Sequence, residues 1–268
     1  MAKAPTAAAA LQHLTLLSGG EANAVVLAYR HAMEAEDLAS ATINRRLAAL
    51  RSVTKLARTL GQITWAVEID GLKNERRRDV RGPDTGERKR IFKAMKVGDT
   101  PLAIRDRAAV ALLFGLGLRR SEVLGLDLAD VDFRGRSVRV LRKGRREKVA
   151  LSLPAEVARY LGEWALARGS EPGPLFTRTD RPGSLDRLSG EGLARAVARL
   201  GEAAKLDRRL TPHQFRHAAV TKIRSGGIND RDAIAFSGHA TAKTLELYDD
   251  TAREAQGKVA GMVSKELG

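Results

Sequence analysis

The sequence predicts a mainly α-helical chain of two domains, with a small antiparallel β-sheet in the second domain. Most segments repeat apolar residues every three or four positions, which is the period of an amphipathic helix. One stretch, 137–153, alternates apolar and polar residues instead, as a β-hairpin does. The segment 71–86 is rich in Arg, Gly and Pro and is typical of a linker. We therefore place the domains at 1–82 and 83–268.

The first domain is predicted to hold two helices after a frayed, alanine-rich lead-in. The first helix covers 21–35 and repeats the apolar residues Val25, Val26, Tyr29 and Met33 at helical spacing. The second begins at Ser40 or Thr42, either of which can cap it. Its apolar side is expected to consist of Ile43, Leu47, Leu50, Val53, Leu56 and Leu60.

The opposite side of that second helix carries the cations Arg45, Arg46, Arg51, Lys55 and Arg58. A row of this kind is either an ordinary solvated face or a surface whose cations neutralise the phosphates of a DNA duplex. In view of the motifs in the second half of the chain, we favour the DNA-binding interpretation.

The second domain is predicted to be built around a helix at 102–116, which is too rich in Ala, Val and Leu to be anything but buried. The hairpin follows, with the basic turn Arg142-Lys143-Gly144-Arg145-Arg146 at its tip. A further helix runs from Pro154 to about residue 168, and another covers 189–204. Between them, Leu175-Phe176 is expected to form a short buried strand.

Composition restricts the class of partner. The chain has 47 Lys and Arg against 32 Asp and Glu, a net charge of +15, which favours a polyanion and nucleic acid first. The absence of cysteine excludes disulfides and thiolate zinc sites. We find neither a signal peptide nor a stretch long enough to span a membrane, so we expect a cytoplasmic protein without membrane partners.

Candidate reactive residues gather in 210–248. Pro212 suits the first turn of a helix, on which His213 and Arg216 share a face because they are three residues apart. A guanidinium that stays charged beside an imidazole that exchanges a proton is suited to a phosphate. Tyr248 is a candidate nucleophile. His213 and His217 have the spacing of a helical zinc site, but Gln214 replaces the expected glutamate, so we predict no metal.

These motifs resemble the tyrosine recombinase (phage integrase) family. The family's signature is an Arg in Gly-Leu-Arg-x-x-Glu, a Lys on a hairpin, His-x-x-Arg, Gly-His, and a Tyr nine residues after that His. All are present in order as Arg119, Lys143, His213, Arg216, His239 and Tyr248. The resemblance runs from about residue 82 to the C-terminus, and 42–51 also resembles the end of the family's N-terminal DNA-clamping domain.

The resemblance implies a site-specific recombinase that cuts DNA through a 3′-phosphotyrosyl intermediate without a cofactor or metal. Arg119 and Arg216 would clamp the phosphate, His239 would add a hydrogen bond, His213 would act as base, Tyr248 would attack, and Lys143 would protonate the leaving 5′ oxygen. Glu122, one turn beyond Arg119, could orient that guanidinium. Lys148 is the alternative to Lys143. The expected DNA contacts are Arg45, Arg46, Arg51, Lys55, Arg142, Arg145 and Arg146.

The implied partner is double-stranded DNA, bound by a homo-oligomer. A tetramer on paired sites would form if the last helix docks into a neighbouring protomer; packing on its own domain is the alternative. The same chemistry also serves a type IB topoisomerase, which reseals one strand without exchange. An inactive DNA-binding protein of the same fold would bind without forming a covalent adduct.

Overall fold

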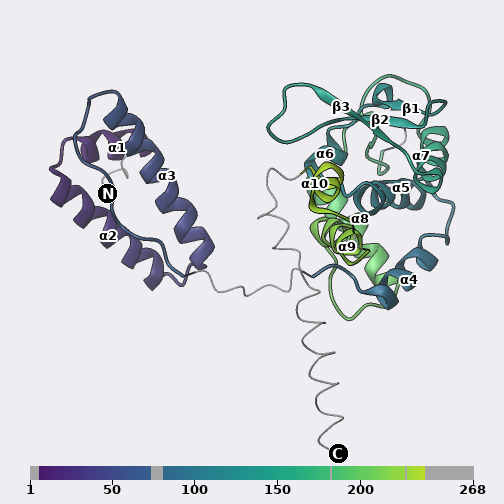
Figure 1. The fold of residues 1–268 in the computed structure, drawn as a ribbon, viewed down its shortest axis with the longest axis horizontal. Helices are drawn as coiled ribbons and strands as arrows, with labels where there is room; N and C mark the ends of the chain where they lie inside the picture. Colours follow the sequence, from purple (N-terminus) through teal and green to yellow (C-terminus); the bar gives the residue numbers. More distant parts are fainter. Residues whose placement is uncertain (1–5, 74–80, 182, 227, 239–268) are drawn as a thin grey trace, which may run out of the picture. The chain divides into compact units, whose positions relative to one another are not determined.

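The protein is described by a computed structural model that covers residues 6–73, 81–181, 183–226 and 228–238 of the 268. The chain divides into two compact units, Met1–Asp79 and Val80–Gly268. The predicted fold class is confirmed, because the described residues are mostly helical with a three-stranded antiparallel sheet (Figure 1). None of the helices in these residues is both long and apolar enough to cross a lipid bilayer.

The first unit contains helices α1 (Ala7–Thr15), α2 (Gly19–Ala35) and α3 (Ser40–Thr59). The expectation of a frayed lead-in is wrong for α1. Its alanines have the highest helix propensity of any residue, and the Thr6 hydroxyl caps it by accepting from the Ala9 N–H. Ser18 and Glu21 form a capping box on α2. The N-cap of α3 is Ala39, so neither Ser40 nor Thr42 caps that helix.

Two asparagines fasten the extended chain that follows α3. Asn23 on α2 donates to the Ala66 carbonyl at 3.0 Å and accepts from the Glu68 N–H at 2.9 Å. Asn44 on α3 does the same at Leu72, donating at 2.8 Å and accepting at 2.7 Å. The segment therefore closes the unit without strand partners, since these amide side chains satisfy its backbone groups.

The apolar rows predicted for α2 and α3 are only partly buried. Val26, Met33, Ile43, Leu47 and Val67 form the core of this unit. Five residues that we assigned to the buried sides are exposed instead, namely Val25, Tyr29, Val53, Leu56 and Leu60. A unit of this size has little interior, so a helix with a wide apolar stripe leaves part of the stripe in solvent.

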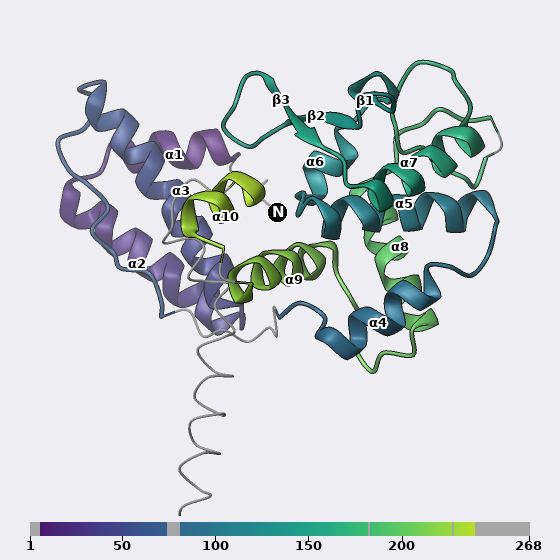
Figure 2. The same cartoon turned by 45° about the vertical axis from the view of Figure 1, so that its right-hand side comes forward.

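Helix α5 (Pro101–Gly115) is the central element of the second unit, and α7 (Ala155–Arg168), α8 (Gly190–Ala203) and α9 (Pro212–Ser225) pack against it (Figure 2). Helices α5, α7 and α8 lie within one or two residues of the predicted ranges, and α9 begins at Pro212 as predicted. Helix α4 (Thr85–Ala94) contacts α8, α6 (Arg120–Leu124) follows α5 after a tight turn, and α10 (Asp230–Ser237) packs on α9.

The predicted hairpin is confirmed as β2 (Ser137–Leu141) and β3 (Lys148–Ser152), which pair from Ser137 with Ser152 to Leu141 with Lys148. Val138 and Val140 are fully buried and attach the sheet to the core. The two-residue β1 (Val131–Asp132) adds a third strand that is too short to give a period in the sequence. A short 3₁₀ turn, Leu128–Asp130, precedes it.

Two other expectations are corrected. Leu175 and Phe176 are buried, but they form no strand; isolated bridges flank them at Pro174 and Thr177. The predicted linker also ends too late, because α4 begins at Thr85 with Asp84 as its cap. Of the linker's arginines, Arg76, Arg77 and Arg78 lie outside the described residues.

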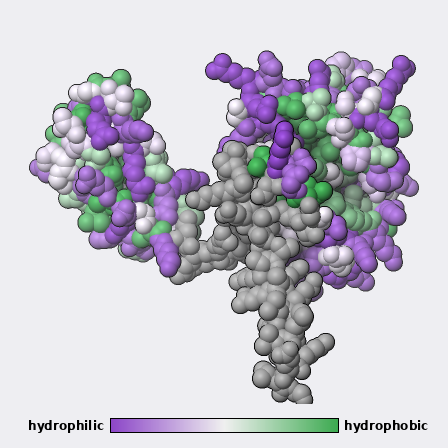
Figure 3. Space-filling model, in the orientation of Figure 1, coloured by the Kyte–Doolittle hydropathy of each residue, from purple (hydrophilic) through white to green (hydrophobic). Residues whose placement is uncertain are grey.

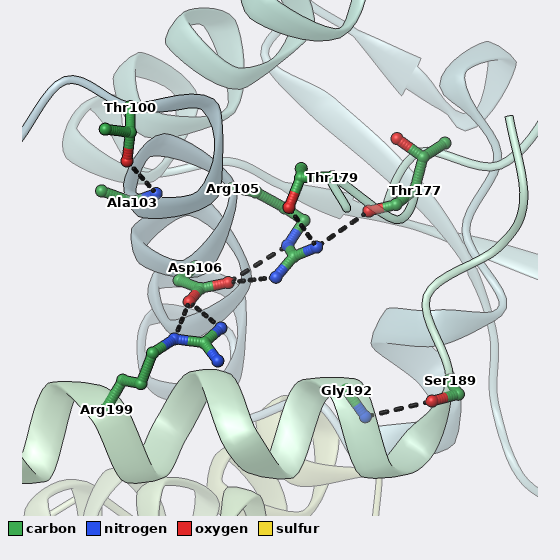
Figure 4. Close-up of polar contacts among 9 residues, drawn as sticks. All are labelled: Thr100, Ala103, Arg105, Asp106, Thr177, Thr179, Ser189, Gly192 and Arg199. Carbon is green, nitrogen blue, oxygen red and sulfur yellow. Dashed lines mark hydrogen bonds and ion pairs between the residues drawn. The ribbon is translucent and has the colours of Figure 1, made fainter. Parts of the chain in front are cut away.

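A buried ionic cluster joins α5 to α8 and to the loop after Phe176 (Figure 4). Asp106 is 4% exposed and accepts from Arg105 at 2.7 Å on one oxygen and from Arg199 at 2.5 Å on the other. Arg105 also donates to the Thr177 carbonyl and the Thr179 hydroxyl, both at 3.1 Å. The cluster fixes α5, whose C-terminal end leads directly into the candidate site.

Candidate active site

Arg119 lies at the turn between α5 and α6, where Glu122 holds it. The Glu122 carboxylate is buried and accepts from the Arg119 backbone N–H and from its Nη1, each at 2.8 Å. Arg119 Nη2 donates to the Gly238 carbonyl at 3.1 Å, at the end of α10. The side chain keeps 24% of its surface exposed, so a fixed guanidinium remains open to a ligand.

Arg216 approaches the same turn from α9. It is 1% exposed, and its Nη1 donates to the Gly117 carbonyl, two residues before Arg119. Gly117 has φ +58, and a Cβ there would lie 2.6 Å from Cε1 of Phe236. A glycine is therefore required both by the left-handed backbone and by the aromatic ring of α10. The contact with Gly117 thus brings Arg216 to the turn that carries Arg119.

Helix α9 begins at Pro212, as predicted, and His213 is its second residue and is exposed to solvent. Partial loss of hydration lowers the pKa of His213, and the charges of His217, Arg216 and Arg119 lower it further. Because the charges of both arginines lower this pKa, both guanidiniums lie near the His213 imidazole. A neutral ring beside two cations is suited to accept a proton when an anionic phosphate is also present.

The cations at the turn of the β2–β3 hairpin differ in exposure and in their contacts, although the sequence grouped them together. Lys143, Arg145 and Arg146 are exposed, in the region where hydrophilic side chains gather over the hairpin (Figure 3). Lys148 is instead bound to the buried Asp130 at 2.6 Å. Between the two candidate lysines, this pairing favours Lys143.

Arg142 differs from its neighbours on the turn, because it points inward. It is 6% exposed, and its Nη2 donates to the Phe236 carbonyl at 3.0 Å. Its side chain faces the end of α10 rather than solvent, and its expected contact with DNA stays a prediction. From the sequence we named Arg142 as a DNA contact but did not predict its attachment to α10.

The other predicted residues fall into three groups. Arg45, Arg46 and Lys55 are exposed on α3, whereas Arg51 is half-buried and donates to the Ile69 carbonyl at 2.9 Å. His217 is 2% exposed and its Nδ1 lies 3.3 Å from the Thr221 hydroxyl. His239, Tyr248 and the last predicted helix lie outside the described residues. Within those residues, no cluster of His, Asp and Glu is arranged to hold a metal ion.

Comparison with curated proteins gives the family. A model of the phage integrase family matches residues 84–255. A tyrosine recombinase from Synechococcus elongatus is 36% identical over 264 residues, covering 97% of this chain and 82% of that protein. A tyrosine recombinase from Synechocystis is 34% identical over 251 residues, covering 91% of this chain and 79% of that protein.

Solved structures share the fold. The XerH site-specific recombinase bound to a palindromic difH substrate matches with a TM-score of 0.70 at 16% identity, over 92% of this chain and 73% of that one. The Tn1549 transposon integrase in complex with transposon right end DNA gives 0.65 at 19% identity, over 89% and 85% of the two chains. With the family match and the curated relatives, these observations show that the chain belongs to the phage integrase family of tyrosine-type site-specific DNA recombinases.

Proposed function

We propose that this recombinase cuts and rejoins double-stranded DNA through a 3′-phosphotyrosyl intermediate formed on Tyr248. One observation carries the proposal: Arg216 donates to the carbonyl of Gly117, two residues before Arg119, so the two arginines meet at a single turn, and the charges of both lower the pKa of His213. Two guanidiniums can each donate two parallel hydrogen bonds to the non-bridging oxygens of a phosphodiester. Positioning and charge stabilisation of this kind supply most of the catalysis in phosphoryl transfer.

The proposed step conserves atoms and protons. The Tyr248 oxygen attacks phosphorus, and its proton passes to His213, because a phenol with a reference pKa of about 10 is protonated near neutral pH. The bond from phosphorus to the 5′ oxygen breaks, and Lys143 donates a proton to that oxygen. His239 adds a hydrogen bond to the phosphate. Reversal by another strand's 5′ hydroxyl rejoins the DNA, since the phosphotyrosyl link keeps the phosphoester bond.

A trapped-complex assay tests the proposal. Genomic fragments carrying random nicks lose a short strand after cleavage, so the enzyme stays attached and the adduct can be sequenced. We expect the wild-type chain to form adducts at a defined site, and Tyr248→Phe to bind the same DNA without any adduct. A normal adduct yield from Tyr248→Phe would place the nucleophile elsewhere. Relaxation of any supercoiled plasmid, without joined products, would indicate a topoisomerase.

We further propose that the active form is a homotetramer on two paired sites. The λ integrase structure that shares this fold is a dimer bound to a COC′ core site, and two such dimers on paired sites would make four chains. Sedimentation of the chain with DNA that carries the sequenced site checks the stoichiometry. Four chains per two duplexes are expected, and one chain per duplex at saturation would contradict the tetramer.

A further inference from the structure

The turn of the β2–β3 hairpin is fastened at both of its ends. At the β3 end, Lys148 Nζ lies 2.6 Å from the Asp130 carboxylate, which is 4% exposed. At the β2 end, Arg142 is 6% exposed, although Lys143 beside it is open to solvent. The residues between these two points are the exposed part of the turn, and Lys143 comes directly after the Arg142 attachment.

Arg142 reaches the C-terminal end of α10. Its Nη2 donates to the Phe236 carbonyl at 3.0 Å, and its guanidinium covers Gly238, where a Cβ would lie 2.5 Å from Nη1. The last carbonyls of a helix have no partner within the helix and form the negative end of its dipole. Arg119 takes the Gly238 carbonyl of the same end. The β2–β3 hairpin, through Arg142, and the turn between α5 and α6, through Arg119, are therefore both attached to the C-terminal end of α10.

The electrostatics of this position argue against a merely structural arginine. Burial lowers the pKa of Arg142, Glu122 raises it, and the nearby charges of Arg119 and Arg145 lower it. Arg142 Nη1 is buried with no hydrogen-bond partner in the part of the chain that the structure describes. A buried cation next to other cations costs stability. Residues that retain such a cost are found most often at functional sites.

We propose that Arg142 is a positioning residue: it anchors the hairpin to the end of α10 and so holds Lys143 at a fixed place beside Arg119. The anchor itself rests only on the contacts above. Its consequence for catalysis rests on the proposed function, in which Lys143 protonates the leaving 5′ oxygen.

The anchor can be tested without any activity. The chain has no cysteine, so Arg145→Cys provides a single attachment point for a spin label on the turn. We expect Arg142→Met to raise the nanosecond mobility of that label, and Arg142→Lys to raise it less, because the ammonium can still reach a carbonyl. Arg134→Met is the control: Arg134 lies in the loop between β1 and β2 and is exposed. Equal mobility in Arg142→Met and the control would overturn the anchor.

The catalytic consequence needs a substrate that does not require Lys143. A DNA strand with sulfur in place of the bridging 5′ oxygen releases a thiol, whose reference pKa of about 8.5 lets it leave without a donated proton. On ordinary DNA we expect Arg142→Met to cleave about a hundredfold more slowly, as misplacement of a reacting group by an ångström does. On the sulfur substrate its rate should equal that of the wild-type chain, as should the rate of Lys143→Met.

Combining the variants separates the possible explanations. In a Lys143→Met background, Arg142→Met should slow cleavage of ordinary DNA no further, because both changes remove the same proton transfer. A defect of Arg142→Met that persists on the sulfur substrate, or that adds to Lys143→Met, would show that Arg142 acts on the phosphate or on α10 and would overturn the proposal. If the wild-type chain cleaves neither substrate, the proposed function fails, and the label mobility still decides whether Arg142 anchors the turn.

Discussion

The guanidinium of Arg119 has more hydrogen-bond donors than its contacts within the protein use. Arg119 gives Nη1 to Glu122 and Nη2 to the Gly238 carbonyl, out of the five N–H donors of an arginine. Glu122 is almost fully buried, so little water competes for its carboxylate, and the carboxylate holds the Arg119 guanidinium in one orientation. The remaining donors are fixed before DNA arrives, which is the condition for electrostatic stabilisation of a transition state.

Arg119→Lys should therefore slow cleavage by about 10² to 10³, because an ammonium cannot reproduce a fixed, planar set of donors. Single-turnover cleavage of a nicked substrate at saturating enzyme measures this, and the dissociation constant for DNA should change far less. Circular dichroism and thermal unfolding of the variant control for its fold. A near-normal cleavage rate would remove Arg119 from the site.

The lowered pKa of His213 leads to a prediction about pH. Because its folded-state pKa lies below the usual value of about 6.5, the folded chain binds fewer protons here than the unfolded chain. This contribution to stability is complete above the unfolded pKa and is lost as pH falls toward the folded one. NMR titration of the free protein should show the depressed pKa. Arg119→Gln should raise it, since the Arg119 charge is one of its causes. Arg120→Gln, which removes the exposed neighbouring charge, should leave it unchanged.

Arg119, His213 and Arg216 were singled out because each stands in a short linear motif of the family signature. The inward turn of Arg142 has no such signal. Five basic residues crowd the hairpin tip, and periodicity cannot tell which of them is buried. The carbonyl that accepts from Arg142 lies on a helix 94 residues away along the chain. Contacts of that separation come from the tertiary fold, so they could not be predicted from the local pattern.

At the scale of elements, the hairpin and the helices α5, α7, α8 and α9 were predictable for different reasons. The hairpin and α8 have a clear period, α7 and α9 begin with a Pro, and α5 is dense in apolar residues. Helix α4 was missed, since Ile91 is its only buried residue and its other positions are largely charged. The buried side of α3 was predicted too widely at Val53, Leu56 and Leu60, where apolar residues at helical spacing stay exposed. The period of apolar residues shows which side of a helix can be buried, and the size of the unit decides how many of those residues are buried.

The ionic cluster at Asp106 gives a prediction at this scale. Asp106→Ala should lower the free energy of unfolding of the second unit by about 3–5 kcal/mol, because it leaves the buried Arg105 without its carboxylate. The control is Glu191→Ala, whose exposed pair with Arg195 should contribute about 0–1 kcal/mol. Denaturant titration in a Trp65→Phe background reports this unit through Trp164, the other tryptophan of the chain. A destabilisation by Asp106→Ala no larger than that of the control would show that the cluster is solvated.

The charge of the whole molecule is distributed between two kinds of cation. Some are paired with carboxylates, as Arg159 is with Glu156 and Glu163 at 2.9 and 2.5 Å. Others are exposed with no ion pair to a described carboxylate, among them Arg45, Arg46 and Lys55 on α3. Only cations of the second kind are free to displace counterions from a duplex, so net charge alone overstates the interface.

DNA binding should therefore weaken steeply as the salt concentration rises. The exposed cations of α3 should account for a measurable part of that salt dependence. Changing Arg45, Arg46 and Lys55 to glutamine should reduce the slope of log affinity against log salt by about 0.9 for each phosphate that the variant no longer neutralises. A control with the same change of net charge replaces Arg159, Arg178 and Arg195, all paired with carboxylates, by glutamine. Fluorescence anisotropy across a salt series measures both slopes. The control should retain the wild-type slope, because its cations are already neutralised by protein carboxylates. Equal reductions in the two variants would mean that the overall field, and not a DNA-facing side of α3, attracts the duplex.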